Sequence, residues 1–151
     1  MDQDDIVDVL NDLIENCRDG EYGFESCAEH VKSAELRDTF VARAAECRAA
    51  ASELQILVSE CGGTPDEGGS VSGAVHRGWV AVKGTLAGYS DIAMLEECER
   101  GEDVAKARYK KALENNVLPE PIRSVIERQY QGVLRNHDQV RMLRDRFRAA
   151  A

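Results

Sequence analysis

The sequence PIRSVIERQYQGVLRNHDQVRMLRDRF, residues 121–147, decides the fold. Its apolar side chains recur at steps of four, four, three, seven and seven residues, which is the period of one face of an α-helix. His137 lies midway through the first step of seven, so the pattern predicts that its imidazole faces a core. The residues of this stripe are Ile122, Ile126, Tyr130, Val133, Val140 and Phe147.

Similar spacing indicates further helices along the chain. Long helices are expected over residues 3–32, 34–61, 90–116 and 120–148, and a shorter one over 70–87. The links between the first and second long helices and between the third and fourth are short. Each of these pairs is therefore expected to pack as an antiparallel hairpin.

Glycine and proline mark the helix ends. Gly62 and Gly63 follow the second long helix, and Pro119 and Pro121 precede the last, as is usual at helix boundaries. Gly20 interrupts the first helix, but the apolar stripe keeps its phase across it. The segment 62–89 is too long for a tight turn, so it is expected to run along the bundle as a crossover that contains the short helix. The chain of 151 residues is expected to form one domain over 1–151.

The charge of the chain is negative and unevenly distributed. The net charge is −9, which argues against general binding to nucleic acid, because phosphates require a basic surface. Residues 1–30 hold ten acids and one base, whereas the chain from Pro119 onward holds seven arginines and four acids. We expect an acidic first helix and a basic last helix to attract each other.

The cysteines and the hydropathy bear on the cellular compartment. The number of cysteines is odd and none forms a CxxC pair, so reduced thiols in a core are expected, with a thiol-based sensor as an alternative. The acidic N-terminus does not resemble a secretory signal, and no apolar run approaches the ~18 residues of a membrane span. A cytoplasmic protein is expected. The cysteines are Cys17, Cys27, Cys47, Cys61 and Cys98.

Several segments resemble known proteins. They are Cys17–Phe24, Ser52–Gln55 through Cys61–Gly63, Val75–Trp79, Leu95–Asp103, and Glu127–Tyr130 with His137 and Asp138. In these segments the chain is similar to an uncharacterised bacterial family of ferritin-like four-helix bundles, a domain of unknown function. The resemblance implies an all-α ferritin-like four-helix bundle over nearly the whole chain, and it implies little about chemistry.

Two-iron proteins of the ferritin-like group use Glu-x-x-His pairs, which this chain lacks. Their spacing of three places both ligands on one helix face. The residues three positions before His30, His76 and His137 are a cysteine, a glycine and a leucine. The sequence therefore disfavours ferroxidase or oxygenase chemistry, and enzymatic activity in general is not expected.

A smaller metal site is a second hypothesis. Three carboxylates and an imidazole lie at similar depth, roughly twenty residues from their turns, and such ligands suit a divalent iron, manganese or zinc ion. A buried histidine more often has a structural hydrogen-bond partner, and Tyr109, Glu97 or a backbone carbonyl is expected to serve His137. The candidate ligands are His137, Glu97, Glu53 and Glu15, with Glu21 and Glu102 as alternates.

The short helix over 70–87 motivates the leading hypothesis for function. Trp79 lies on its apolar face with Val75 and Val82, and the helix contains no acid. We expect a non-enzymatic bundle that acts by self-association, with a dimer favoured, or by binding a protein partner. The alternative is a stress-related metal-binding protein with the smaller site described above.

Overall fold

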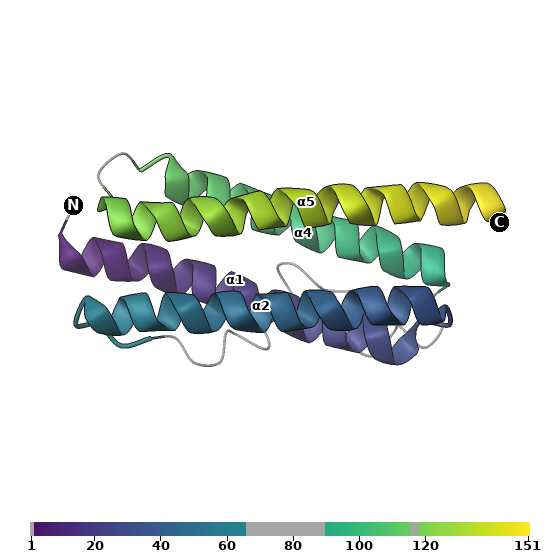
Figure 1. Cartoon of the computed structure of the whole chain (residues 1–151), viewed down its shortest axis with the longest axis horizontal. Coiled ribbons are helices and arrows are strands. Elements are labelled where there is room, and N and C mark those ends of the chain that lie inside the picture. The colour runs from purple at the N-terminus through teal and green to yellow at the C-terminus, as the bar shows by residue number, and fades with distance from the viewer. Residues whose placement is uncertain (1, 66–89, 116–117) are drawn as a thin grey trace.

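The computed structural model describes residues 2–65, 90–115 and 118–151, and over these ranges the chain forms α-helices and no strand. The helices are α1 (Gln3–His30), α2 (Ala34–Glu60), α4 (Asp91–Leu113) and α5 (Glu120–Ala150). They pack as a four-helix bundle, which confirms the predicted fold class (Figure 1). The helix expected over 70–87 lies outside the described residues. The assignment of 1–151 to one domain stays a prediction.

Side-chain caps fix the start of three helices. Asp2 accepts a hydrogen bond from the N–H of Asp5 at 2.9 Å, and Ser33 and Ser90 serve α2 and α4 in the same way. Each cap satisfies one of the N–H groups that have no partner within the helix. α1 continues through Gly20 as a single helix of 28 residues. None of the described helices is long and apolar enough to cross a membrane.

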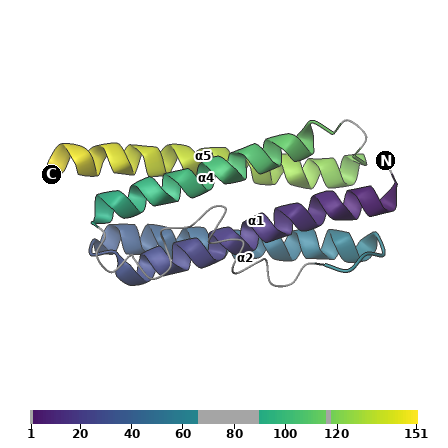
Figure 2. The same cartoon turned by 180° about the vertical axis from the view of Figure 1, so that it is seen from behind.

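The helices form two hairpins that run along one long axis. α1 pairs with α2 and α4 pairs with α5. α2 ends at one end of the bundle and α4 begins at the other (Figures 1 and 2). The connection between them therefore joins opposite ends, as the sequence predicts for a long crossover.

The two hairpins contact each other unequally. α1 and α4 are the main pair across the hairpins, whereas α2 and α5 contact each other sparsely. Asp91, the first residue of α4, reinforces this contact. Its carboxylate accepts hydrogen bonds from the backbone N–H groups of Lys32 and Ser33, each at 2.9 Å. The turn between α1 and α2 is thus held against the start of α4.

The buried core divides into two clusters along the bundle. One holds Phe24, Cys27, Ala28, Val31, Leu36, Phe40, Ala44, Met94, Leu95, Cys98, Val140 and Leu143. The other holds Ile6, Leu10, Leu13, Ile14, Cys17, Ala51, Leu54, Val58, Tyr109, Ala112, Leu118, Ile122 and Ile126. Because each cluster draws on all four helices, either end of the bundle is closed by packed side chains.

The ion pairs correct the expected attraction between the first and last helices. Among the described residues, four arginines of α5 pair with acids of its two neighbours, α2 and α4. These pairs are Arg128–Glu53, Arg146–Glu35, Arg144–Glu99 and Arg148–Glu96. The acids of α1 pair instead with Arg48 of α2 and Arg108 of α4. α1 and α5 are not neighbours in this bundle, so their opposite charges do not meet.

Candidate functional site

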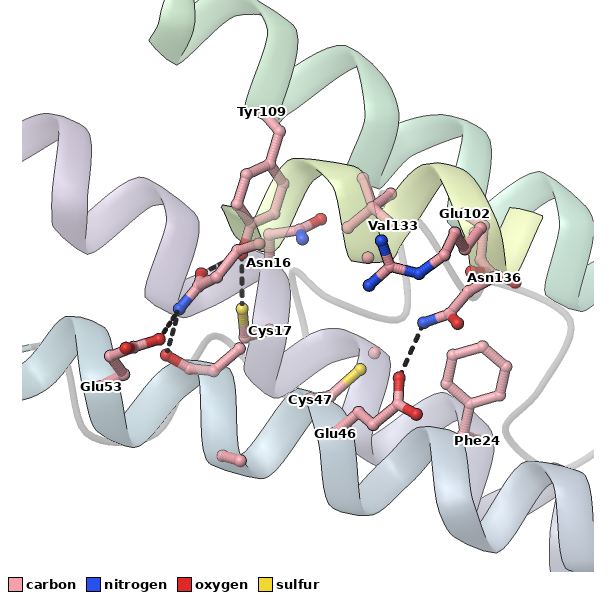
Figure 3. A pocket seen from close by; sticks show the side chains of 18 of the residues that line it. Asn16, Cys17, Phe24, Glu46, Cys47, Glu53, Glu102, Tyr109, Val133 and Asn136 are labelled. Carbon is pink, nitrogen blue, oxygen red and sulfur yellow. Dashed lines mark hydrogen bonds between the residues drawn. The ribbon is translucent and has the colours of Figure 1, made fainter. Parts of the chain in front are cut away.

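A cavity lies at the middle of the bundle, where neither core cluster fills the interior. Its volume is about 620 Å³, and all four helices line it (Figure 3). The lining residues fall within 16–24 of α1, 46–53 of α2, 101–109 of α4 and 128–136 of α5. Each range is near the middle of its helix, so the cavity is a feature of the whole bundle.

Small residues leave this space empty. Protein interiors are normally packed as densely as organic crystals, so a cavity of this size requires side chains that do not reach inward. The lining includes Gly20, Ala49, Ala50, Gly101, Ala105 and Gly132. A Cβ atom built at Gly132 would lie 3.6 Å from Nη2 of Arg135, which is an ordinary contact. The space beside Gly132 is therefore open.

The cavity opens between α2 and α5. The exposed members of its lining are Glu46 and Ala49 on α2 and Arg128 and Arg135 on α5. The lining residues of α1 and α4 are buried or half-buried. The opening therefore coincides with the pair of neighbouring helices that contact each other least.

Glu102 is the buried acid of the cavity. Only 5% of the residue is exposed, and its Oε1 has no hydrogen-bond partner among the described residues. Burial disfavours the charged form and raises the pKa of Glu102 to about 8, although the positive charge of Arg43 opposes the shift. The carboxyl group is therefore mostly protonated at neutral pH.

A chain of hydrogen bonds crosses the other half of the cavity. The hydroxyl of Tyr109 donates to Oε1 of Gln129 at 2.7 Å and lies 3.3 Å from Sγ of Cys17. Nε2 of Gln129 donates in turn to Oε1 of Glu53 at 2.7 Å. Burial raises the pKa of Cys17 to about 11 and raises that of Tyr109 as well, so both groups stay protonated at neutral pH.

The two carboxylates at the opening already have partners. Glu46 accepts from Nη1 of Arg43 at 2.7 Å and from Nδ2 of Asn136 at 2.9 Å. Glu53 pairs with Arg128 in addition to Gln129. Glu102 is therefore the cavity carboxyl that keeps an oxygen without a partner.

His137 is buried, as its place in the apolar stripe predicts, but it does not line the cavity. It is 7% exposed, and its Nε2 lies 2.7 Å from Oδ1 of Asp103. Nδ1 lies 3.7 Å from Oδ1 of Asp138. The partner of this histidine is Asp103, and not Tyr109, Glu97 or a carbonyl as expected.

The four residues predicted to bind a metal have separate partners. Glu15 lies 3.8 Å from Nη2 of Arg108, Glu97 pairs with Arg100, and only Glu53 of the four lines the cavity. The described ranges contain no group of three or more His, Cys, Asp or Glu side chains arranged to hold a metal ion. Metal binding by Glu15, Glu53, Glu97 and His137 stays a prediction.

Glu21 and Glu102, the two alternate metal ligands, have different surroundings. Glu21 forms ion pairs with Arg18 at 2.9 Å and with Arg48 at 2.8 Å. Glu102 is buried in the cavity, as described above. Trp79, Val75 and Val82, the predicted interface residues, lie outside the described residues.

The cavity does not fit the two-iron centre that ferritin-like folds often carry. Such a centre needs a glutamate from each of two helices and a Glu-x-x-His pair from each of the others. This cavity has three carboxylates and no histidine, and two of those carboxylates are held by arginine and amide groups. The residues present suit a different ligand.

Sequence reasoning did not find the cavity itself. Gly101, a residue small enough to let helices approach closely, lines the open space instead. A usable signal was present, because small residues recur at mid-helix in every long helix, at Gly20, Ala50, Gly101 and Gly132. The same pattern also occurs where helices pack tightly, so it does not identify a cavity without coordinates.

Comparison with a family and with solved structures agrees with this fold. A family model described as "Domain of unknown function (DUF2383)" matches residues 5–115, a range that includes α2, α4 and all but the first two residues of α1. No curated protein matches the chain. The resemblance to an uncharacterised ferritin-like family, stated from the sequence, is confirmed.

Solved structures with a similar fold are ferritin-like proteins. The bacterioferritin-related protein of Bacteroides fragilis, a dodecameric thioferritin, aligns at a TM-score of 0.80 and 16% identity, over 99% of this chain and 90% of that one. A mutant of Dps1 from Mycobacterium smegmatis aligns at 0.74 and 14% identity, over 93% and 95%. The DPS protein from Vibrio cholerae O1, a member of the ferritin-like diiron-carboxylate superfamily, aligns at 0.78 and 12% identity, over 93% and 89%. At these identities the likeness shows the fold alone.

Proposed function

Since the chain belongs to the family described as Domain of unknown function (DUF2383), whose model carries no established activity, we propose a function from the cavity: the protein binds a small organic molecule at the middle of its bundle. The observation that carries the proposal is an open space lined by a buried carboxyl group, one oxygen of which has no hydrogen-bond partner in the part of the chain that the structure describes. Binding, and not catalysis, is proposed.

The size and the lining of the cavity support this function. Sites for small organic ligands have volumes of roughly 300–1,000 Å³ and combine apolar walls with a few polar groups. This cavity of about 620 Å³ lies within that range. Its walls include Phe24, Val133 and several alanines, and a single metal ion would leave most of the space to water.

A cavity-filling variant tests the proposal. A panel of small organic molecules is screened by thermal shift and by calorimetry against the wild-type chain and against Gly132→Leu, whose side chain would occupy the space beside α5. We expect at least one compound to bind the wild type and to lose at least tenfold in affinity against the variant.

Gly132→Ala is the matched control for this experiment. Its added methyl group meets only an ordinary contact, so the cavity stays open and binding should persist. The proposal fails if no compound in the panel binds the wild type, or if Gly132→Leu binds every compound as tightly as Gly132→Ala does. Circular dichroism confirms that both variants keep their helices.

A second proposed function is self-association. The similar protein from Bacteroides fragilis is dodecameric, which supports a homo-oligomer here, with a dimer as its smallest unit. Two of the large apolar side chains that are exposed on the described residues, Val41 and Ile56, lie on α2, and Ile56 is 62% exposed. Apolar side chains contribute to the buried centre of contacts between subunits.

Light scattering after gel filtration tests this function. We expect a mass of at least two chains, and we expect Ile56→Glu to reduce it. Met142→Glu, a change on the exposed surface of α5, is the matched control and should leave the mass unchanged. A strict monomer of the wild type at high concentration would rule the function out.

A further inference from the structure

We propose that the ligand of the central cavity is a small organic cation, an ammonium group on an apolar body, and that Glu102 binds its charge. This inference rests on the proposed binding function and adds the chemical class of the ligand. It is carried by a contrast within the cavity: Oε1 of Glu102 has no hydrogen-bond partner among the described residues, whereas Tyr109, Gln129 and Glu53 are bonded to one another.

The first argument is the position of Glu102. A buried polar atom normally has a hydrogen-bond partner, and one without a partner destabilises the folded chain. Oε1 of Glu102 has none among the described residues, and the residue itself lines a space large enough for a second molecule. A ligand that brings a positive charge beside this carboxyl group would give it an electrostatic partner and favour the ionised form of the acid.

The second argument is that three other polar side chains of the cavity already have hydrogen-bond partners. Tyr109, Gln129 and Glu53 already bond to one another, and Gln129 uses both its carbonyl and its amide. Two helical turns of α4 separate Glu102 from Tyr109, a distance of about 10 Å along the axis. A ligand with one charged group at Glu102 and an apolar remainder therefore matches the cavity.

The third argument is the set of walls around Glu102. Phe24 lies on the same side of the cavity in Figure 3, and Val133 and Ala105 border the space. Aromatic rings attract cations, most strongly where water is excluded. An apolar body gains free energy from leaving water against these walls.

The charges near Glu102 also favour a cation. Three acids raise the pKa of Glu102 through their negative charge, namely Glu46 on α2 and Asp103 and Glu99 on α4. Arg43 on α2 is the opposing charge. Its Nη1 and Nη2 donate to Glu46 and Gln139, and its Nε has no hydrogen-bond partner among the described residues. The remaining titratable or charged groups of the cavity wall are Cys17, Cys47, Glu53, Tyr109, Arg128 and Arg135. Close to Glu102 three acids outnumber one arginine, so a cation is favoured over an anion at this end of the cavity.

The experiment compares matched triplets of ligands. Benzyltrimethylammonium is measured by calorimetry beside its uncharged tert-butyl counterpart and beside phenylacetate, and a cyclohexyl triplet repeats the comparison. The quaternary ammonium keeps its charge at every pH, so a change of affinity with pH reports on the protein. We expect the cations to bind at least tenfold more tightly than the neutral and anionic members at pH 8.

The pH dependence provides a specific readout. A cation binds the ionised form of Glu102, whose pKa is about 8 in the empty cavity. Its affinity should therefore rise about 50-fold between pH 6 and pH 8, and binding at pH 7 should release close to one proton. Glu102→Gln should reduce the affinity at pH 8 at least tenfold and remove the pH dependence. A neutral ligand that accepts a hydrogen bond from the protonated acid would show the opposite trend.

The outcomes separate this inference from the function on which it rests. If neutral or anionic members bind as tightly as the cations, and Gly132→Leu still abolishes binding, the function stands and the cationic ligand is ruled out. The same conclusion follows if Glu102→Gln, folded by circular dichroism, binds the cations with unchanged affinity. If no compound of the triplets or of the wider panel binds, both proposals fail.

Discussion

At the scale of single residues, Glu102 and Tyr109 are both buried but differ in their polar contacts. Both are on α4 and both border the cavity. Tyr109 contacts Gln129 and Cys17, whereas Oε1 of Glu102 is buried without a hydrogen bond from the described residues. Each difference has a measurable consequence for stability.

Glu102→Gln is expected to remove a pH dependence of stability. The pKa of Glu102 is about 8 in the folded chain, against an ordinary value of 4.5, so the folded state holds a proton that the unfolded state releases. The stabilisation is fully present below pH 4.5 and is lost as the pH rises to about 8. Between pH 5 and pH 7 the free energy of unfolding of the wild type should fall by roughly 2 kcal/mol more than that of the variant. Urea unfolding at both pH values measures this, and parallel pH profiles would contradict it.

Tyr109→Phe is expected to destabilise the chain by about 1–3 kcal/mol, because it leaves the buried carbonyl of Gln129 without its donor. Tyr22→Phe is the matched control, since Tyr22 is only half-buried, and it should change the free energy of unfolding by less than about 0.5 kcal/mol. Denaturant unfolding at one pH compares the two variants. Equal effects would show that the bond from Tyr109 to Gln129 contributes nothing to stability.

At the scale of the helices, glycines at mid-helix have opposite roles in α1 and α5. A Cβ atom at Gly20 would lie only 2.9 Å from Sγ of Cys47, so α1 and α2 approach closely there. A Cβ atom at Gly132 meets an ordinary contact. Glycine thus avoids a clash at position 20, whereas at position 132 it only lowers the stability of the helix.

Gly132→Ala should therefore stabilise the chain by about 0.5–1 kcal/mol, the difference in helix propensity between the two residues. Gly20→Ala should destabilise it, because the propensity gain is opposed by the clash with Cys47. Thermal unfolding of both variants measures the contrast. The double variant Gly20→Ala with Cys47→Ala should recover part of the loss, and no recovery would show that Cys47 is not the obstacle.

The helices could be predicted from the sequence because each buries one face. The apolar residues of a buried face recur along the sequence with the period of a helix. Ile122, Ile126 and Val140 are all buried, and His137 is buried among them. The pattern does not state which helices are neighbours. For this reason the attraction expected between α1 and α5 was wrong, since the arginines of α5 meet acids of α2 and α4.

The cavity could not be predicted for a related reason. A cavity forms where four helices diverge from one another. The place of divergence is set by how the helices cross, and the residues of any one helix do not determine it. Glu102 was named from its sequence position as an alternate metal ligand, and the structure places it among the buried residues. Its unpaired oxygen and the bond from Tyr109 to Gln129 depend on contacts between helices, which the spacing of residues does not contain.

At the scale of the whole molecule, the two hairpins are held together mainly along α1 and α4, and Asp91 ties the turn of one hairpin to the start of the other. Asp91→Ala is expected to cost about 1–3 kcal/mol, because two backbone N–H groups lose their charged acceptor. Asp38→Ala, a change of an exposed acid on α2, should cost less than about 0.5 kcal/mol. Urea unfolding compares them, and equal losses would show that Asp91 does not join the hairpins.

The direction of the helices has a practical consequence. α1 begins at one end of the bundle and α5 finishes at the other, where the N and C marks stand in Figure 1. A fluorescent label attached beside Gln3 and another beside Ala150 would be separated by about the length of α5, roughly 46 Å for its 31 residues. Energy transfer between such labels on neighbouring subunits would reveal whether an assembly joins its rods head to head or side by side.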